Sequence, residues 1–214
     1  MEIDRRSLLA AIGASAAIFP AISRATTLRP APVEVLGPFY PRLRPRDQDF
    51  DLTRLAGHSE RAIGQVIELS GRVLFPDGSP ASGALLDIWQ SNAAGRYTSP
   101  HDNNPAPLDP NFQGSAKLRA GPDGTYRIVT IKPGMYPVDG IHIRAPHIHF
   151  DIAARNTRLV TQMYFPGDPD NDRDMLRPRM AGIGSDPELL TCHALDLRAD
   201  GVARFSWDIV ILKS

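Results

Sequence analysis

Cysteine is almost absent from this sequence of 214 residues, and the single Cys192 excludes an internal disulfide. Cys192 lies in an apolar run, so we expect a small buried core residue. Aromatic residues make up only 7% of the chain, and neither charge dominates, because 24 Lys and Arg balance 24 Asp and Glu. Proteins that bind nucleic acid usually carry a basic surface with interleaved aromatic residues, so we expect no nucleic-acid partner.

Residues 1–25 have the features of an export signal. Two adjacent arginines, Arg5 and Arg6, precede an apolar run at 8–19, and a small-residue pattern suited to cleavage ends at Ala25. This resembles a bacterial twin-arginine signal, which predicts a periplasmic or secreted protein that uses the export machinery. A short amphipathic helix and an uncleaved anchor are the alternatives. No later apolar run is long enough to cross a bilayer.

The remaining chain divides into an extended arm at 26–60, rich in Pro and Arg, and a β-sandwich domain at 61–214. Short segments with strand character recur between turns rich in Gly, Pro, Asp and Asn, whereas no long amphipathic helix is predicted. The expected strands lie at 66–74, 84–90, 126–131, 147–153, 159–165, 192–197 and 203–212. We expect two long irregular connections, about 98–120 and 166–188, to surround a pocket mouth. The pattern predicts an all-β, antiparallel β-sandwich with long irregular loops.

Turn sequences such as Pro76-Asp77-Gly78 and Pro133-Gly134 allow a different function. They are typical of small sandwich modules of the prealbumin type, in which they only close hairpins. Taken alone, these turns favour an exported, non-catalytic β-sandwich binding module.

The segment His147-Ile148-His149 indicates metal chemistry. On a β-strand, residues two apart point to the same face, so the two imidazoles would lie side by side. Neutral imidazole is a common metal ligand, and two on one strand provide half of a metal site. The alternative is a strand with two partly exposed histidines.

Two tyrosines that follow turns, Tyr97 and Tyr136, could complete such a site. A lone tyrosine at such a position is usually a packing residue with a hydrogen-bonded hydroxyl. Phenolate, however, is a hard anionic donor suited to Fe(III). Two phenolates and two imidazoles would leave a ferric ion with a formal charge of +1, which one hydroxide would neutralise. Zinc prefers His, Cys and carboxylate ligands, so a zinc-dependent hydrolase would need a third ligand of that kind beside the histidines.

At these residues the chain resembles the intradiol ring-cleavage dioxygenases, most closely the branch of protocatechuate 3,4-dioxygenase. The resemblance extends from about Gly37 to Trp207. Its strongest segments are Gly37-Pro38-Phe39-Tyr40, 87–97 ending at Tyr97, 130–137 around Tyr136, Arg144-Ala145-Pro146-His147-Ile148-His149-Phe150 and 161–165. The resemblance implies a β-sandwich with a mononuclear non-haem Fe(III). It implies that the iron ligands are Tyr97, Tyr136, His147 and His149.

The same resemblance implies roles for other residues. Tyr136 would be the tyrosinate that leaves the iron when substrate chelates it. Arg144 would stabilise carbanion character on the substrate ring, and Gln162 would lie near that arginine; a surface ion pair is the alternative for Arg144. Trp89 would be an aromatic residue beside the pocket, or otherwise a core residue. The remaining expected substrate contacts are Gly37, Pro38 and Tyr40.

The implied activity is the opening of a catechol between its two hydroxyls by O₂, which yields a cis,cis-muconate-type diacid in aromatic catabolism. The domain at 61–214 would then be catalytic, and the arm could embrace a neighbour in a homo-oligomer. Two departures from the family concern the pocket. Arg144-Ala145-Pro146 replaces the more frequent order Arg-Pro-Ala, and Val138 stands where close relatives can carry a bulky aromatic residue. The sequence therefore does not fix which catechol is the substrate.

Overall fold

The fold was analysed in a computed structural model that describes residues 27–42, 44, 47, 49–182 and 185–213. The predicted export signal at 1–25 lies outside these residues. Within the described part of the chain, no helix is both long enough and apolar enough to cross a membrane.

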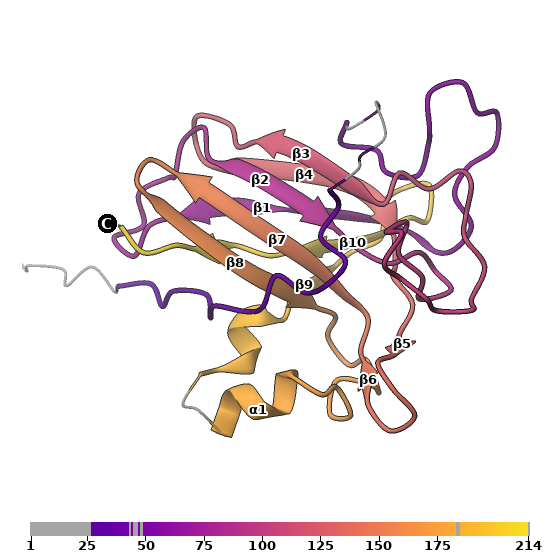
Figure 1. Cartoon of the computed structure of the whole chain (residues 1–214). Coiled ribbons are helices and arrows are strands. Elements are labelled where there is room, and N and C mark those ends of the chain that lie inside the picture. Colours follow the sequence, from indigo (N-terminus) through magenta and orange to yellow (C-terminus); the bar gives the residue numbers. More distant parts are fainter. Residues whose placement is uncertain (1–26, 43, 45–46, 48, 183–184, 214) are drawn as a thin grey trace, which may run out of the picture.

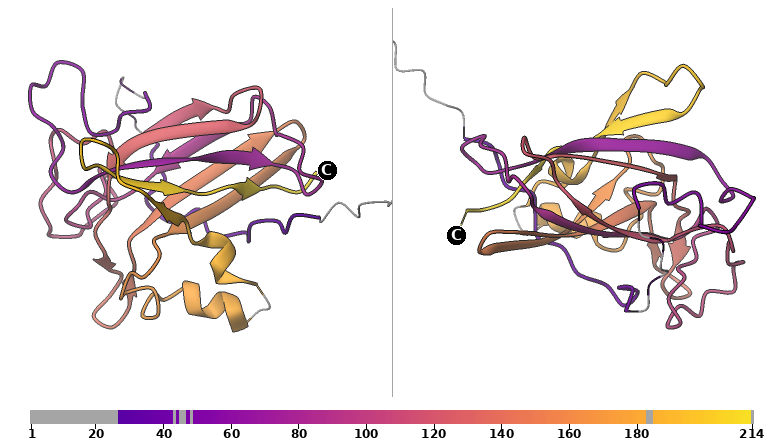
Figure 2. Two further views of the ribbon diagram at one scale, coloured as in Figure 1. Left: turned by 180° about the vertical axis from the view of Figure 1, so that it is seen from behind. Right: turned by 90° about the horizontal axis from the view of Figure 1, so that it is seen from above.

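Two β-sheets pack face to face and form the centre of the molecule (Figures 1 and 2). The five-stranded sheet contains β1 (Val66–Leu74), β4 (Thr125–Ile131), β9 (His193–Leu195), β10 (Ala203–Ser206) and β11 (Ile209–Val210). The four-stranded sheet has the order β3 (Ser115–Arg119), β2 (Leu85–Trp89), β7 (His147–Ala154) and β8 (Thr157–Tyr164). A short hairpin of β5 (Tyr136–Pro137) and β6 (Ile143–Arg144) projects from one end.

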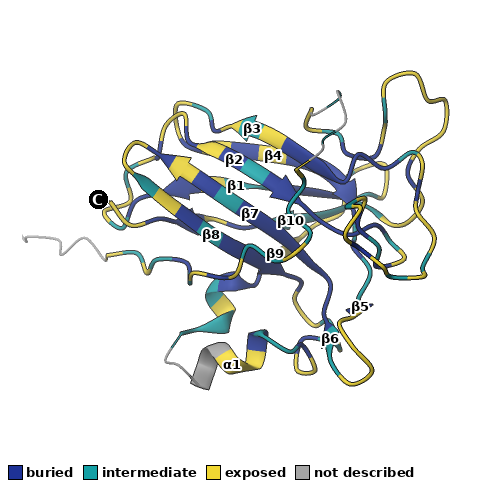
Figure 3. Cartoon of the chain, viewed as in Figure 1, coloured by how far each residue is buried: buried dark blue, intermediate teal, exposed yellow. Residues whose placement is uncertain are grey.

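The predicted all-β sandwich is confirmed, and most strand pairs are antiparallel. The pairing of β1 with β10 and with β11 is parallel, so the larger sheet is mixed. The core lies between the sheets, where the longer strands turn their apolar side chains inward (Figure 3), whereas the three residues of β9 are exposed. Cys192 belongs to this core as expected, and burial raises the pKa of its thiol to about 12.

Three predicted segments need correction. The long connection at 98–120 contains a strand, β3, which pairs with β2 although its sequence, SAKLR, has little apolar alternation. The connection at 166–188 contains the short helix α1 (Arg177–Gly182) and the start of a 3₁₀ turn at Pro187–Leu190. The predicted strand at 203–212 divides into β10 and β11. The division falls at Trp207, whose carbonyl accepts a hydrogen bond from the Tyr126 hydroxyl at 2.8 Å.

The described part of the arm runs along the outside of the sandwich (Figure 1). Its backbone N–H groups at Leu28, Ala31 and Glu34 donate to carbonyls of residues 76, 210 and 160, so it is tied to both sheets. The arm then reaches the end of the sandwich that carries β5 and β6. This course brings the segment Gly37-Pro38-Phe39 over the end of β7. The approach is close, since a Cβ added at Gly37 would lie 3.4 Å from the His149 ring.

Candidate metal centre and adjoining cavity

Two glycines bring the two tyrosine-bearing turns into backbone contact. A Cβ at Gly95 would lie 2.1 Å from the carbonyl oxygen of Met135, and one at Gly134 would lie 2.4 Å from that of Ala93. Real Cβ atoms do not approach so closely, so only glycine permits this packing. As a result the rings of Tyr97 and Tyr136 lie 5.5 Å apart, centre to centre, at an angle of 86°.

The turn before Tyr97 is held by side-chain acceptors. The side-chain oxygen of Asn92 accepts from the N–H groups of Ala94 and Arg96, both at 2.9 Å. The carboxylate of Asp102 accepts from the N–H of Tyr97 at 2.7 Å. These bonds fix the backbone from which the Tyr97 ring projects, as is usual for Asn and Asp in turns.

His147 and His149 project from the same face of β7, as their spacing predicts. Their Nε2 atoms are 3.1 Å apart. Nδ1 of His147 lies 2.6 Å from the carbonyl oxygen of Ala145, which can only accept, so Nδ1 carries the proton and donates it. The lone pair of His147 is therefore on Nε2, which faces His149 and Tyr97.

Three of the donor atoms are close enough to share one ion, and the ring of the fourth residue, Tyr136, lies beside them. The Tyr97 hydroxyl is 3.3 Å from Nε2 of His147, and the Tyr136 ring is 5.7 Å from the His147 ring. Two donors about 2.1 Å from one metal ion and at right angles are roughly 3 Å apart. The observed separations of 3.1 and 3.3 Å are of this size. Tyr97, His147, His149 and Tyr136 thus fit a mononuclear site.

The protonation of these residues also suits a metal ion of high charge. Burial, together with the charge of Arg144, lowers the pKa of His147 well below its usual value. Burial does the same for the pKa of His149, and so do any positive charge on the adjacent His147 and the charge of Arg144. Both imidazoles are therefore neutral, which is the ligating form. Burial raises the pKa of Tyr97 and Tyr136, so their ionisation needs a nearby cation.

Among the described residues, no group of three or more His, Cys, Asp or Glu side chains could hold a metal ion. The third ligand that a zinc hydrolase would require beside His147 and His149 is therefore not found in this part of the chain. The donor set includes two tyrosines instead, which favours a hard trivalent ion.

Trp89 and Tyr40 lie behind His149. The indole of Trp89 stacks on the His149 ring at 4.7 Å with an angle of 6°, and Tyr40 meets Trp89 edge-on at 5.1 Å. The Tyr40 hydroxyl donates to Asp87 at 2.8 Å. Neither aromatic residue is among the residues that line the adjoining cavity. Their predicted contact with substrate stays a prediction, and the structure shows a contact with His149.

Arg144 is buried beside the four donors and held by several partners. Its Nε donates to Asp174 at 3.0 Å, and its Nη2 donates to Gln162 and, at 3.0 Å, to the Tyr164 hydroxyl. Burial acts against its charge, but Tyr164 and Asp174 leave the pKa of Arg144 above its usual value. Gln162 also donates to the carbonyl of Val35 in the arm at 3.1 Å. Arg144 is therefore a fixed charge in a buried network, and not a surface ion pair.

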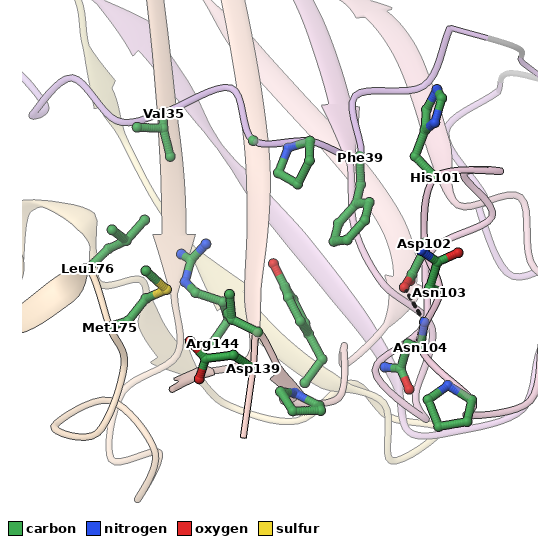
Figure 4. A pocket seen from close by; sticks show the side chains of 16 residues that line it. Val35, Phe39, His101, Asp102, Asn103, Asn104, Asp139, Arg144, Met175 and Leu176 are labelled. Carbon is green, nitrogen blue, oxygen red and sulfur yellow. Dashed lines mark hydrogen bonds between the residues drawn. The ribbon is translucent and has the colours of Figure 1, made fainter. Parts of the chain in front are cut away.

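A cavity of about 600 Å³ opens next to the donors (Figure 4). Tyr136 and Arg144 form part of its wall, together with Gly37 and Pro38. The contact of Gly37 and Pro38 with substrate stays a prediction. The described residues that line it come from the arm, the loop at 101–105, the β5–β6 hairpin and the segment at 175–176. The two long connections thus do reach the pocket, as their length predicted.

Sequence reasoning missed Asp174 and Asp102. Asp174 is one of several aspartates at 168–174, and nothing in the sequence separates it from its neighbours. Asp102 likewise follows an exposed-looking turn. Both are buried in the structure, and both accept hydrogen bonds from the backbone that carries a proposed ligand or Arg144.

Comparison with known proteins agrees with this geometry. The family model described as "Dioxygenase" matches residues 35–213. The chain is 41% identical over 169 residues to the protocatechuate 3,4-dioxygenase beta chain of Burkholderia cepacia, which covers 76% of this chain and 71% of the relative. The dioxygenase domain of a dioxygenase carbohydrate-binding protein fusion from Streptomyces sp. SirexAA-E has a TM-score of 0.65 at 27% identity and covers 87% of this chain and 100% of that one.

A third comparison concerns the fold alone. The intradiol ring-cleavage dioxygenase from Tetranychus urticae has a TM-score of 0.67 at 18% identity, and the match covers 86% of this chain and 95% of that one. With the family match over most of its length, the chain belongs to the intradiol ring-cleavage dioxygenases and is an oxygenase. The non-catalytic module that the turns alone favoured is not supported.

Proposed function

We propose that the protein uses a mononuclear Fe(III) to open a catechol-type aromatic diol between its hydroxyls with O₂. The product would be a cis,cis-muconate-type diacid. The observation that carries the proposal is the convergence of two tyrosines and two neutral histidines beside a cavity, with Nε2 and hydroxyl separations of 3.1 and 3.3 Å. The family membership supports the same activity.

Ferric iron bound by Tyr97, Tyr136, His147 and His149 would supply the Lewis acidity that holds both catechol oxygens and the redox chemistry that activates the ring toward O₂. Tyr136 lines the cavity, whereas Tyr97, His147 and His149 are not among the described residues that line it. As a phenolate, Tyr136 would accept a proton from an entering diol and would move aside as it does so.

Arg144 would act on the ring and not on the diol oxygens. It lines the cavity beside Tyr136, with which it pairs across the β5–β6 hairpin. Its bonds to Asp174 and Gln162 hold the guanidinium in place before substrate enters. A preorganised cation stabilises negative charge that develops on the ring without reorganising during the reaction.

The test is the colour of the ferric-loaded protein and its use of O₂. Phenolate-to-iron charge transfer should give a visible absorption band, and catechol should cause O₂ uptake with a ring-opened diacid product. Tyr136→Phe should change the band and slow turnover. Tyr126→Phe is the matched control, because Tyr126 is buried but hydrogen-bonded to Trp207 outside the site. A colourless protein with full iron occupancy would contradict the proposal.

We also propose that the enzyme forms oligomers. Two relatives are named as the alpha and beta chains of protocatechuate 3,4-dioxygenase, which supports an assembly of more than one chain. Size-exclusion chromatography with light scattering on the purified protein tests this, and a mass of one chain at micromolar concentration would contradict it.

A further inference from the structure

The cavity beside Tyr136 has more room than a bare catechol requires. Its volume of about 600 Å³ lies within the range of roughly 300–1,000 Å³ typical of sites for drug-sized ligands. A diol that points its two oxygens at the four donors would extend the opposite edge of its ring into this space. The chemistry of the cavity wall therefore decides which ring substituents are accepted.

Among the described residues, the wall offers one cation to a carboxylate substituent, and that cation is already paired with an aspartate. Arg144 is the single Lys or Arg among the described residues that line the cavity, and its Nε and Nη2 are engaged by Asp174 and Gln162. Two acidic residues, Asp102 and Asp139, line the same cavity. Apart from His101, the described residues of the wall therefore carry one positive and two negative side chains.

The negative charge of Asp139 persists under all ordinary conditions. Hydrogen bonds from the His142 side chain and backbone lower the pKa of Asp139 to about 2. A further acidic side chain, Glu34, is buried near Arg144; burial raises the pKa of its carboxyl, and the charge of Arg144 acts against that rise. A substituent carboxylate would lose water and meet mostly like charge, which is unfavourable unless a cation pairs with it.

The rest of the wall is apolar. Val35 and Phe39 reach the cavity from the arm, Val138 from the β5–β6 hairpin, and Met175 and Leu176 from the segment before α1. Figure 4 shows Met175 and Leu176 on the same side of the cavity as Arg144, with Val35 near them. Val35 and Val138 are about half exposed, so they have apolar surface that a ligand could cover.

We propose that this cavity selects catechols whose ring substituent is uncharged and apolar, such as an alkyl, aryl or ester group, over carboxylated catechols. The inference rests on the proposed dioxygenase function and adds its substrate class. The proposed substrate class differs from the substrate for which the protocatechuate 3,4-dioxygenase relative is named, because protocatechuate carries a carboxylate.

A matched pair of substrates tests the proposal. Methyl 3,4-dihydroxybenzoate and protocatechuate differ in the charge of one group, and 4-butylcatechol adds a plain alkyl substituent. With iron-loaded full-length protein we expect kcat/KM at least tenfold higher for the ester and for 4-butylcatechol than for protocatechuate. Equal or higher kcat/KM for protocatechuate would overturn this inference and leave the proposed function intact. Turnover of none of these diols would overturn both.

A binding measurement tests the same selectivity without chemistry. Methyl 4-hydroxybenzoate and 4-hydroxybenzoate are unreactive monophenols that differ in the same charge. Calorimetric titration of the metal-free protein should give a dissociation constant at least tenfold lower for the ester. Equal affinity, or tighter binding of the acid, would contradict the inference.

A variant with an added cation should reverse the preference. Val138→Lys places an ammonium at the cavity wall, and it should lower the ratio of ester to acid kcat/KM at least fivefold. Leu212→Lys is the control, because Leu212 is exposed near the C-terminus and away from the cavity wall, and it should leave the ratio unchanged. An unchanged ratio in Val138→Lys would contradict the proposal.

Discussion

Asp174 and Arg144 form a buried ion pair, and the same Asp174 oxygen also accepts from the backbone N–H of Ala145, at 3.0 and 2.7 Å respectively. The carbonyl of Ala145 then accepts from Nδ1 of His147. One carboxylate therefore positions both the cavity arginine and a proposed iron ligand. The bond to Ala145 requires an N–H, which proline at this position, as in the more frequent family order, would lack.

Asp174→Asn should weaken this arrangement. It removes the charge that compensates buried Arg144, so we expect a loss of about 3 kcal/mol in the free energy of unfolding. We also expect kcat for catechol to fall at least tenfold. Denaturant titration and O₂ uptake measure the two effects. Asp172→Asn, at an exposed position of the same loop, should change neither. If the kcat of Asp174→Asn equalled that of the wild-type protein, Asp174 would not be needed to position Arg144 and His147.

Trp89 should matter for metal affinity through His149. Nδ1 of His149 is buried and has no hydrogen-bond partner among the described residues, so the stacked indole supports the ring on the side where a hydrogen bond is lacking. Trp89→Leu should weaken iron binding about 10–100-fold, the usual effect of losing support for a ligand. Competition with a chelator measures it. Trp89→Phe keeps an aromatic face and should restore most of the affinity; equal losses in both variants would argue against stacking as the cause.

Gly95→Ala should separate the two tyrosine-bearing turns. The added Cβ would lie 2.1 Å from the Met135 carbonyl oxygen, and the residue has a φ of +80°. We expect a loss of at least 2 kcal/mol in the free energy of unfolding, together with weaker iron binding. Gly78→Ala is the control, because Gly78 has a φ of +81° but nothing within 4 Å of the new Cβ. Its cost should be only about 1 kcal/mol of backbone strain. Equal costs would show that the contact with Met135 is not important.

Glu68 should contribute stability that depends on pH. The hydrogen bond from Arg127, at 2.6 Å, and that from Arg198, at 3.1 Å, lower the pKa of Glu68 in the folded protein. The contribution is therefore complete above the unfolded pKa of about 4.3 and is lost as the pH falls through the lower folded value.

Glu68→Gln should therefore reduce the free energy of unfolding by about 1 kcal/mol at pH 7 and by much less at pH 2. Urea unfolding at both values measures the difference. Glu60→Gln, at an exposed position, is the control. A loss in Glu68→Gln that is the same at both pH values would show that ion pairing is not the cause.

The twin arginines should direct export. Replacing Arg5 and Arg6 by Lys keeps the charge but changes the pattern, and it should leave the protein in the cytoplasm of a bacterial host. Cell fractionation with detection of the chain measures this. A matched control replaces Arg24, near the predicted cleavage site, by Lys. Equal export of both variants would contradict the proposed signal.

The residues that line the cavity could be predicted from the sequence only in part. Gly37 and Pro38 line it, whereas Trp89 and Tyr40 lie behind His149, and the contact of all four with substrate stays a prediction. An aromatic residue at the end of a strand has the same sequence signature in either position. The choice depends on which segment covers the strand end, and here the arm does so.

Features that depend on local geometry could be predicted from the sequence alone. Alternating apolar residues predicted most of the strands, and the spacing of His147 and His149 put both rings on one face, because strand periodicity depends only on the backbone. Three further features depend on the tertiary structure: which aspartate supports Arg144, where the C-terminal strand divides and which charges face the cavity. Those features arise from contacts between segments far apart in the chain, and many sequences with the same local pattern could place them differently.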